Sequence, residues 1–467
     1  MTTNNPHLQS LVTFRNSQGE AARGTLLKFE RTTVVFEVYN PYSIVQLSEV
    51  LTDLTIRRGD DPIYQGRAIV SNLVNTGLML IVSASFVDSW MQSSARFDGQ
   101  IDAFRQEAGE FVSQWDSVNR IKDRYRVAVL ALRSYLSELN HWLQRVEADN
   151  DTAIAELFAT YDRLTDYASP LLERLAVLNE DFEQVAMEVE SNELSIHKAF
   201  AQKELHPLLM ASPYPYRTFT KPLGYAGDYE MMNMTHREVP EGPNAYAKVV
   251  NAAYVRLPIA RCVRNRVRTI QEYLDAGVAD AVEVGRPFRV ISIGCGPAVE
   301  VERFIRSNAR AAYAEFHLLD FNAETLDYVR SMIESAAKDA RREPCVFYVQ
   351  ESVHFLLKSA TAMADNDFTG QFDFVYCAGL FDYFSDKVCA RLLRLFFSWL
   401  IPGGTLLATN MHERTLNRYI IEHLVDWFLV YRNDEQMLQL VPGLGAQRTF
   451  TDETGINLCL EVRNVTH

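Results

Sequence analysis

A short run in the middle of the chain, Arg289-Val-Ile-Ser-Ile-Gly-Cys-Gly-Pro297, constrains the fold more than any other feature. Its aliphatic start predicts a buried strand, and its glycines predict a sharp turn into a helix. Gly294 and Gly296 let the backbone approach a ligand without a Cβ in the way, and the next helix can direct free N–H groups at that ligand. Leu318-Leu-Asp320 then predicts a strand ending in a carboxylate placed to bind a ribose. Together they predict a site for a nucleoside-containing cofactor.

Strand and helix patterns alternate after this run. The predicted helices are 323–340 and 386–400, and the predicted strands are Cys345–Val349, Phe372–Cys377 and Thr405–Thr409, the last after a Pro402-Gly403-Gly404 turn. Two short strand patterns at 448–450 and 456–462 predict a final antiparallel hairpin. Such alternation predicts a Rossmann-like α/β sheet with helices on both faces.

Residues 255–467 resemble class I methyltransferases dependent on S-adenosylmethionine (SAM), because the turn lacks a third glycine, seven strands are expected and the chain ends in a hairpin. The resemblance implies SAM as the cofactor. Where such enzymes usually have an acidic residue before the glycines, this chain has Ser292. The implied cofactor contacts are Ile293, Gly294, Gly296 and Pro297 around the methionine part, Asp320, Phe321 and Asn322 at the ribose, Gln350, Glu351 and Ser352 near the adenine, and Cys377, Ala378 and Leu380 where methyl donor and acceptor meet.

The segment Pro213–Tyr229 is dense in Pro, Gly and Tyr, which predicts an irregular segment that is neither helix nor bundle core. Two interpretations stay open for it, a domain linker or a lid over the methyl donor and acceptor. The run Gly224-Tyr-Ala-Gly-Asp-Tyr-Glu-Met-Met232, with Gly379-Leu-Phe-Asp-Tyr383, resembles bacterial methyltransferases that make the 3-hydroxypalmitic acid methyl ester signal. That resemblance implies O-methylation of a fatty or other carboxylic acid.

Methyl transfer needs alignment and a dry site more than a strong base. A carboxylate acceptor is ionised at pH 7 and needs no base, whereas a hydroxyl or amine acceptor would need one. Tyr225, Tyr383 and His412 are the candidate catalytic residues for positioning the acceptor, with His412 the candidate base. His412 fits equally well as a loop histidine bonded to backbone. Apolar residues that fit either a chain-binding channel or the core are Met231, Met232, Met234, Leu380 and Phe381.

The first ninety residues contain six short β-rich runs, such as Thr33–Val38, which predict a small antiparallel barrel. The barrel resembles a PilZ domain. PilZ domains that bind cyclic di-GMP carry an R-x-x-x-R arm and a D/N-x-S-x-x-G strand motif, and this chain has neither. We therefore expect a barrel for structure or interaction. The alternative function is a PilZ-type signalling protein, whose barrel binds a nucleotide or partner and whose SAM domain is a sensor.

The chain is expected to divide into four parts. These are a PilZ-like barrel at 1–91, a helical bundle at 92–205, a lid and linker at 206–254 and the methyltransferase domain at 255–467. In the helical part, Leu157, Tyr161, Leu164 and Tyr167 repeat an apolar pattern after a break at Asp149-Asn-Asp151. Long amphipathic helices of this kind predict a bundle or a homodimer.

Composition and charge limit the classes of partner that the sequence favours. The net charge of −14 disfavours nucleic acid, no apolar run reaches the ~18–20 residues of a membrane span, and no secretory signal is visible. Six scattered cysteines without a C-x-x-C pair suit small hydrophobic roles in a reducing cytoplasm, and no cluster has metal-ligand spacing. A local exception to the acidic charge is Arg261, Arg264, Arg266 and Arg268. These arginines fit either a solvated helix face or a docking surface for an anionic substrate or the cofactor carboxylate.

Overall fold

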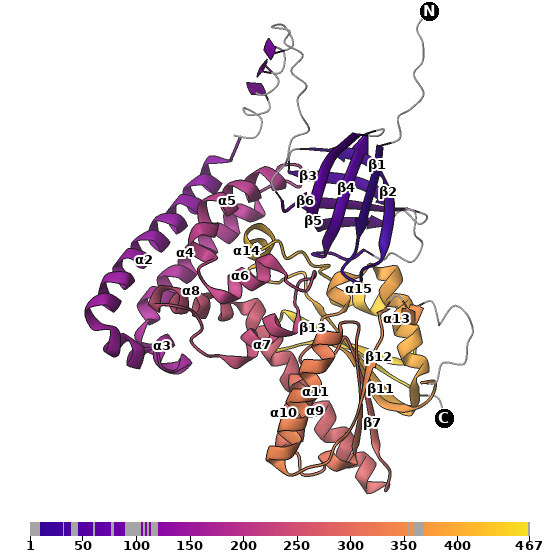
Figure 1. Ribbon diagram of the computed structural model, residues 1–467. Coiled ribbons are helices and arrows are strands. Elements are labelled where there is room, and N and C mark those ends of the chain that lie inside the picture. The colour runs from indigo at the N-terminus through magenta and orange to yellow at the C-terminus, as the bar shows by residue number, and fades with distance from the viewer. Residues whose placement is uncertain are drawn as a thin grey trace, which may run out of the picture. The chain divides into compact units, whose positions relative to one another are not determined.

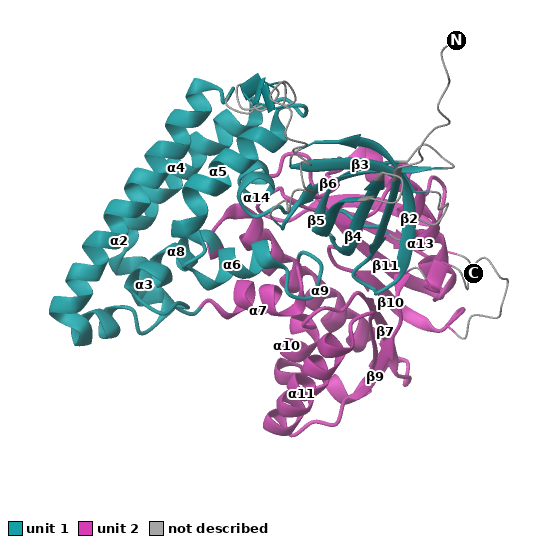
Figure 2. Ribbon diagram, turned by 45° about the horizontal axis from the view of Figure 1, so that its top comes forward, with its two compact units in different colours: residues 1–226, 239–254, 417–428 teal, residues 227–238, 255–416, 429–467 magenta. Residues whose placement is uncertain are grey.

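The computed structural model describes residues 10–30, 32–38, 45–58, 61–75, 79–88, 104–105, 108–109, 112–113, 120–353, 355–357 and 368–465. The chain forms two compact units (Figure 2). Unit 1 contains residues 1–226, 239–254 and 417–428, and unit 2 contains 227–238, 255–416 and 429–467. These units are defined by contacts and each combines separate segments of the chain. The four domains expected from the sequence stay a prediction.

The predicted barrel is confirmed in unit 1. Six antiparallel strands close in the order β1-β2-β3-β6-β5-β4. The barrel closes because β1 pairs with β4. Alternation puts one face of each strand inside, since Val34, Phe36 and Val38 of β3 are buried while the residues between them are partly exposed. The strands are β1 (Ser10–Arg15), β2 (Ala21–Phe29), β3 (Thr33–Val38), β4 (Val50–Arg58), β5 (Asp61–Asn75) and β6 (Leu80–Phe86).

The described part of the predicted helical region is helical, whereas most of residues 92–119 lie outside the described residues. The predicted break at Asp149–Asp151 is a kink inside α2, with Asn150 at φ −145°. Of the four residues in the apolar pattern after this kink, Leu164 is buried, Leu157 and Tyr161 are partly buried and Tyr167 is exposed. The helices are α2 (Asp123–Leu157), α3 (Tyr161–Tyr167), α4 (Ser169–Met187), α5 (Leu194–Leu209), α6 (Pro213–Thr220), α8 (Ala245–Val255) and α14 (Arg418–Leu424).

Helix α6 corrects the expectation that 213–229 is irregular throughout. Pro213 stands in the first turn, where a missing N–H costs nothing, so the proline begins the helix instead of breaking it. Lys221 ends the helix in the left-handed conformation at φ +45°. Only the residues after α6 form the predicted turns, with Gly224 at φ +86° and Gly227 at φ +74°.

Residues 417–428 lie between two segments of unit 2 in sequence but belong to unit 1. Helix α14 lacks a side-chain cap of its own. Glu183 of α4 supplies one, because its carboxylate accepts from the N–H groups of Tyr419 (3.1 Å) and Ile420 (2.8 Å). The segment is thus anchored to helices more than two hundred residues earlier in the chain.

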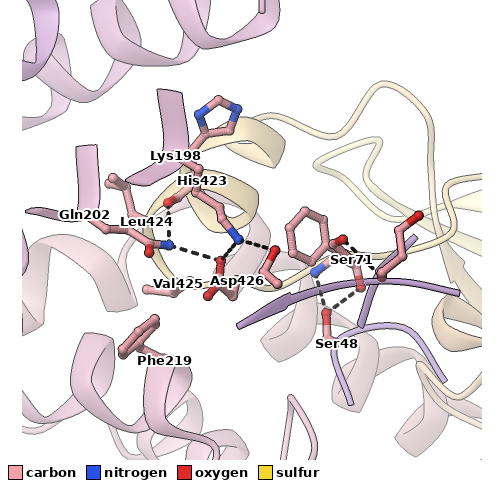
Figure 3. Close-up of polar contacts among 12 residues, drawn as sticks. Ser48, Ser71, Lys198, Gln202, Phe219, His423, Leu424, Val425 and Asp426 are labelled. Carbon is pink, nitrogen blue, oxygen red and sulfur yellow. Dashed lines mark hydrogen bonds and ion pairs between the residues drawn. The ribbon is translucent and has the colours of Figure 1, made fainter. Parts of the chain in front are cut away.

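A buried polar network holds the end of this segment (Figure 3). The Lys198 ammonium lies 2.7 Å from the Asp426 carboxylate and donates to Ser85 of β6 at 2.9 Å. Gln202 also donates to Asp426, at 3.0 Å. Lys221 donates to the Val425 carbonyl at 3.0 Å. Burial alone would raise the pKa of Asp426, but the charges of Lys198 and Lys221 hold it below its usual range.

Unit 2 contains the predicted sheet (Figure 1). Seven strands lie in the order β12-β13-β11-β10-β7-β8-β9. Neighbours from β9 to β11 are parallel, and β13 runs antiparallel between β11 and β12. The predicted terminal hairpin is therefore confirmed. The strands are β7 (Phe288–Ile293), β8 (Ala314–Asp320), β9 (Cys345–Gln350), β10 (Phe372–Cys377), β11 (Leu400–Met411), β12 (Ala446–Thr451) and β13 (Asn457–Arg463).

Helices cover both faces of this sheet, as predicted. Ile291 and Ile293 of β7 face a core that includes α13, whereas Val290 faces a core with α9, α10 and α11. Figure 1 shows α10 and α11 on the side of the strands opposite to α13. The elements of unit 2 are α7 (Tyr229–Arg237), α9 (Pro258–Glu283), α10 (Val299–Ser307), η1 (Ala311–Tyr313), α11 (Ala323–Ala340), η2 (Phe381–Tyr383), α13 (Asp386–Ser398) and α15 (Asp434–Gln439).

The predicted Pro402–Gly404 turn lies inside β11 and does not precede it. The partners of β10 jump there from Leu400 to Thr405, so the three residues form an irregularity in the strand. Gly403 takes φ +82°, which explains the glycine.

Candidate active site

The glycine turn follows β7 and begins α10. Gly294 has φ +65° and Gly296 has φ +52°, so both take the left-handed conformation that glycine adopts without strain. The N–H of Cys295, between them, donates to the Leu319 carbonyl of β8 at 3.0 Å. Ala298 also has a positive φ of +49°, immediately before the first residue of the helix. The turn is thus fixed to the neighbouring strand and leads directly into a helix N-terminus.

Asp320 ends β8 and links two loops. Its carboxylate accepts from the N–H of Gly296 at 3.2 Å and from the N–H of Asn322 at 3.0 Å. Burial raises the pKa of Asp320 to about 6, against the lowering effect of these backbone donors. The predicted pairing of the glycine turn with an acidic strand end therefore exists as direct contact.

The residues expected at the ribose and adenine gather around Asp320. The Glu351 N–H donates to the Asp320 carbonyl at 3.1 Å, and the Gln350 side chain donates to the Phe321 carbonyl at 3.4 Å. The Asn322 side chain caps α11, accepting from the Thr325 N–H at 2.9 Å. Asn322 therefore helps to fix the loop between β8 and α11 by capping the helix.

The end of β10 lies beside the glycine turn. A Cβ placed on Gly294 would lie 3.5 Å from a methyl carbon of Leu380. Cys377 is fully buried, and burial raises the pKa of its thiol well above the usual value. The Gly379 N–H donates to the Thr409 hydroxyl at 2.8 Å. Ala378 and Leu380 are partly exposed, and their roles at the cofactor stay predictions.

His412 follows β11 and is buried. Its Nδ1 accepts from the Arg414 N–H at 3.0 Å, and its Nε2 lies 3.4 Å from the Asp434 carboxylate. Both ring nitrogens therefore have partners. This geometry matches the interpretation of a histidine bonded to its own loop.

Two buried charged residues that the sequence reasoning missed hold the loop after β10. Asp382 accepts from the Met411 N–H at 2.6 Å, and burial raises the pKa of Asp382 to about 7. Arg432 is 1% exposed and donates to the carbonyls of Phe381 (2.9 Å) and Phe384 (2.7 Å). Arg432 thereby fixes η2, the short helix that contains Tyr383. An arginine outside every recognised motif gave no signal in the sequence.

The lid residues fall in both units. Tyr225 belongs to unit 1, whereas Tyr229 and the methionines that follow it belong to unit 2. Tyr229 donates to the Glu324 carboxylate at 2.8 Å. Met231 and Met234 are buried and Met232 is half-buried. The lid and the channel stay predictions.

The arginines of α9 do not act as one surface. Arg261 and Arg268 are exposed and lie 3.2 and 3.9 Å from Glu453. Arg264 donates to the carbonyls of Thr235 and Val255. Arg266 is 9% exposed, and its guanidinium lies against Gly379.

No three His, Cys, Asp or Glu side chains among the described residues come together in a way that could hold a metal ion. No described helix has the length and apolar character to cross a membrane. All six cysteines are free thiols, and five of them are buried.

Neither protein-family models nor curated proteins match this chain. Several solved structures are similar to parts of it. A possible exported protein from Bordetella parapertussis is 18% identical and has a TM-score of 0.45, with 64% of this chain and 97% of that one covered. Magnesium protoporphyrin IX methyltransferase from Synechocystis PCC 6803, with bound S-adenosylhomocysteine (SAH), is 12% identical over 44% and 86% of the chains (TM-score 0.31).

Human N-acetylserotonin methyltransferase in complex with SAM is 15% identical, covers 46% of this chain and 58% of its own, and has a TM-score of 0.28. At these identities and TM-scores, the similarity does not extend to substrate or activity.

Proposed function

We propose that residues 255–467 bind SAM and transfer its methyl group to a small-molecule acceptor. The observation that carries the proposal is the contact between the Asp320 carboxylate and the Gly296 N–H, at 3.2 Å. It brings an acidic strand end and a glycine turn together at one point. In such a pairing the acidic residue can bind the ribose of a nucleoside, and the glycine turn with its helix N-terminus can bind a charged group attached to that nucleoside. Both of the solved methyltransferases described above hold SAH or SAM.

The residues present fit the cofactor. A Cβ added to Gly296 would meet no described atom within 4 Å, so the turn leaves room for a ligand on that side. Asp320 would accept from the ribose hydroxyls with the lone pairs that its backbone donors leave free. Gln350, Glu351 and Ser352 would lie along the base. When bound, SAM supplies a methyl group on a positively charged sulfur.

A carboxylic acid is the acceptor that the site favours. An ionised carboxylate needs no general base, and the candidate base is engaged. To remove a proton, His412 would have to release the Arg414 N–H from its Nδ1. The chain's own contribution is then to orient the acceptor and exclude water. We assign acceptor positioning to Tyr383, held in place through Arg432. Tyr225, which belongs to unit 1, stays a prediction.

The test is methyl transfer from isotopically labelled SAM to 3-hydroxypalmitate and palmitate, with mass spectrometry of the products. Labelled methyl ester is the expected result. Asp320→Ala should abolish it, whereas Asp327→Ala, a change at another acidic residue of unit 2, should not. Label recovered only on hydroxyl or amine products would refute the carboxylic acid assignment. Binding of cyclic di-GMP without SAM binding would favour the signalling alternative.

A further inference from the structure

One arginine of α9 has an environment unlike the other three. Arg261, Arg264 and Arg268 each have a carboxylate within 4 Å. Arg266 is 9% exposed, and among the described residues neither a hydrogen bond nor an ion pair reaches its guanidinium. A buried cation without a partner is costly. Departures of this kind from local rules are expected at functional sites.

Gly379 makes room for this guanidinium. A Cβ added to Gly379 would lie 2.5 Å from Nη1 of Arg266, 3.2 Å from Cζ and 3.3 Å from Nη2. Gly379 also has φ +81°, so both space and conformation require glycine there. The next residue, Leu380, is the one that lies near Gly294. Arg266 is therefore at the β10 end, beside the proposed methyl-transfer site.

The acidic groups that interact electrostatically with Arg266 have other partners. Asp382 accepts from the Met411 N–H, and Glu300 accepts from the Tyr376 hydroxyl at 2.9 Å. Burial raises the pKa of both carboxyls, and the charge of Arg266 partly opposes this. Neither forms an ion pair with Arg266, so its planar set of donors stays available.

We propose that Arg266 binds a carboxylate of a molecule held at the β10 end. A guanidinium matches a carboxylate in shape and charge, and the pair is strong where water is excluded. The inference rests on the proposed function, which offers two sources of this group. One is the methionine carboxylate of SAM, and the other is the carboxylate of the acceptor.

The experiment compares the wild type with Arg266→Met and Arg266→Lys by calorimetry, and Arg268→Met on the exposed face of α9 is the matched control. The ligands are SAH, decarboxylated SAH and decanoate, the last added to SAH-saturated protein. If the cofactor supplies the carboxylate, Arg266→Met weakens SAH binding at least tenfold and leaves the decarboxylated analogue unchanged. If the acceptor supplies it, only decanoate binding is lost. Arg266→Lys should show a partial loss in either case.

Thermal unfolding without ligand separates binding from structure. Because the charge lacks a partner, Arg266→Met should keep or raise the melting temperature, by up to roughly 2–4 °C. Two results would overturn the inference: unchanged affinity for both SAH and decanoate, or a clear fall in the melting temperature. If the wild type itself binds neither SAH nor its decarboxylated analogue, the proposed function fails, and that result is distinct from a failure of Arg266 alone.

Discussion

The buried ion pair between Lys198 and Asp426 gives the sharpest prediction about stability. At 2.7 Å its Coulomb attraction is about 6 kcal/mol for an effective dielectric constant of about 20. Desolvation of both ions offsets most of this, so the pair adds little to stability by itself. Removing one partner is different, because the other charge then stays buried without its ion-pair partner. We expect Lys198→Met to lower the free energy of unfolding of unit 1 by about 3–5 kcal/mol.

A second substitution tests this reasoning. Asp426 has φ +51°, a conformation that asparagine tolerates better than most residues, so Asp426→Asn removes the charge and keeps the backbone. The single Asp426→Asn variant leaves the buried ammonium groups of Lys198 and Lys221 without the Asp426 carboxylate. The double variant, Lys198→Met with Asp426→Asn, should have a free energy of unfolding at least about 2 kcal/mol higher than the two single-variant losses predict when they are added.

Hydrogen exchange of the α5 and α14 amides across a urea series measures the relevant free energy. Arg124→Met is the control, because the Arg124–Glu188 pair is exposed and should contribute at most about 1 kcal/mol. If the loss in the double variant equals the sum of the two single-variant losses within about 0.5 kcal/mol, the predicted energetic coupling between Lys198 and Asp426 is refuted. Unchanged exchange in α14 would refute the assignment of residues 417–428 to unit 1.

Two further predictions concern unit 2. Arg432→Met should destabilise this unit by roughly 3–9 kcal/mol in urea unfolding, because Phe381, Phe384 and Asn410 lose a buried donor at about 1–3 kcal/mol each. A cost near that of Arg463→Met, an exposed control, would contradict this. SAM affinity, measured by calorimetry, should fall about tenfold per pH unit below 6 and stay flat above. The reason is that ribose binding favours ionised Asp320, whose pKa in the free protein is about 6; a flat profile would contradict it.

Local patterns predicted most of the fold. The alternation in Thr33–Val38 predicted a barrel strand, and the order of apolar runs after Phe288 predicted the sheet and its final hairpin. These features depend on neighbours in sequence. The helix at 213–220 was missed because its prolines were interpreted as breakers, although Pro213 stands where a helix accepts proline.

Contacts between distant parts of the chain could not be predicted. Lys198 and Asp426 lie 228 positions apart, and neither belongs to a motif. The environment of Arg266 depends on the missing side chain of Gly379, more than one hundred residues later. By contrast, Gly296 and Asp320 were paired correctly, because adjacent parallel strands end at the same edge of a sheet.

The central claim is that the glycine turn and Asp320 form a SAM site. Isothermal titration of SAM into the wild type, Asp320→Ala and Asp327→Ala tests it most directly. We predict binding by the wild type and the Asp327 variant, with at least about a hundredfold loss for Asp320→Ala, consistent with losing charge-assisted hydrogen bonds of about 1.5–3 kcal/mol each. Absence of binding to the wild type, or equal affinity in all three proteins, would contradict the account.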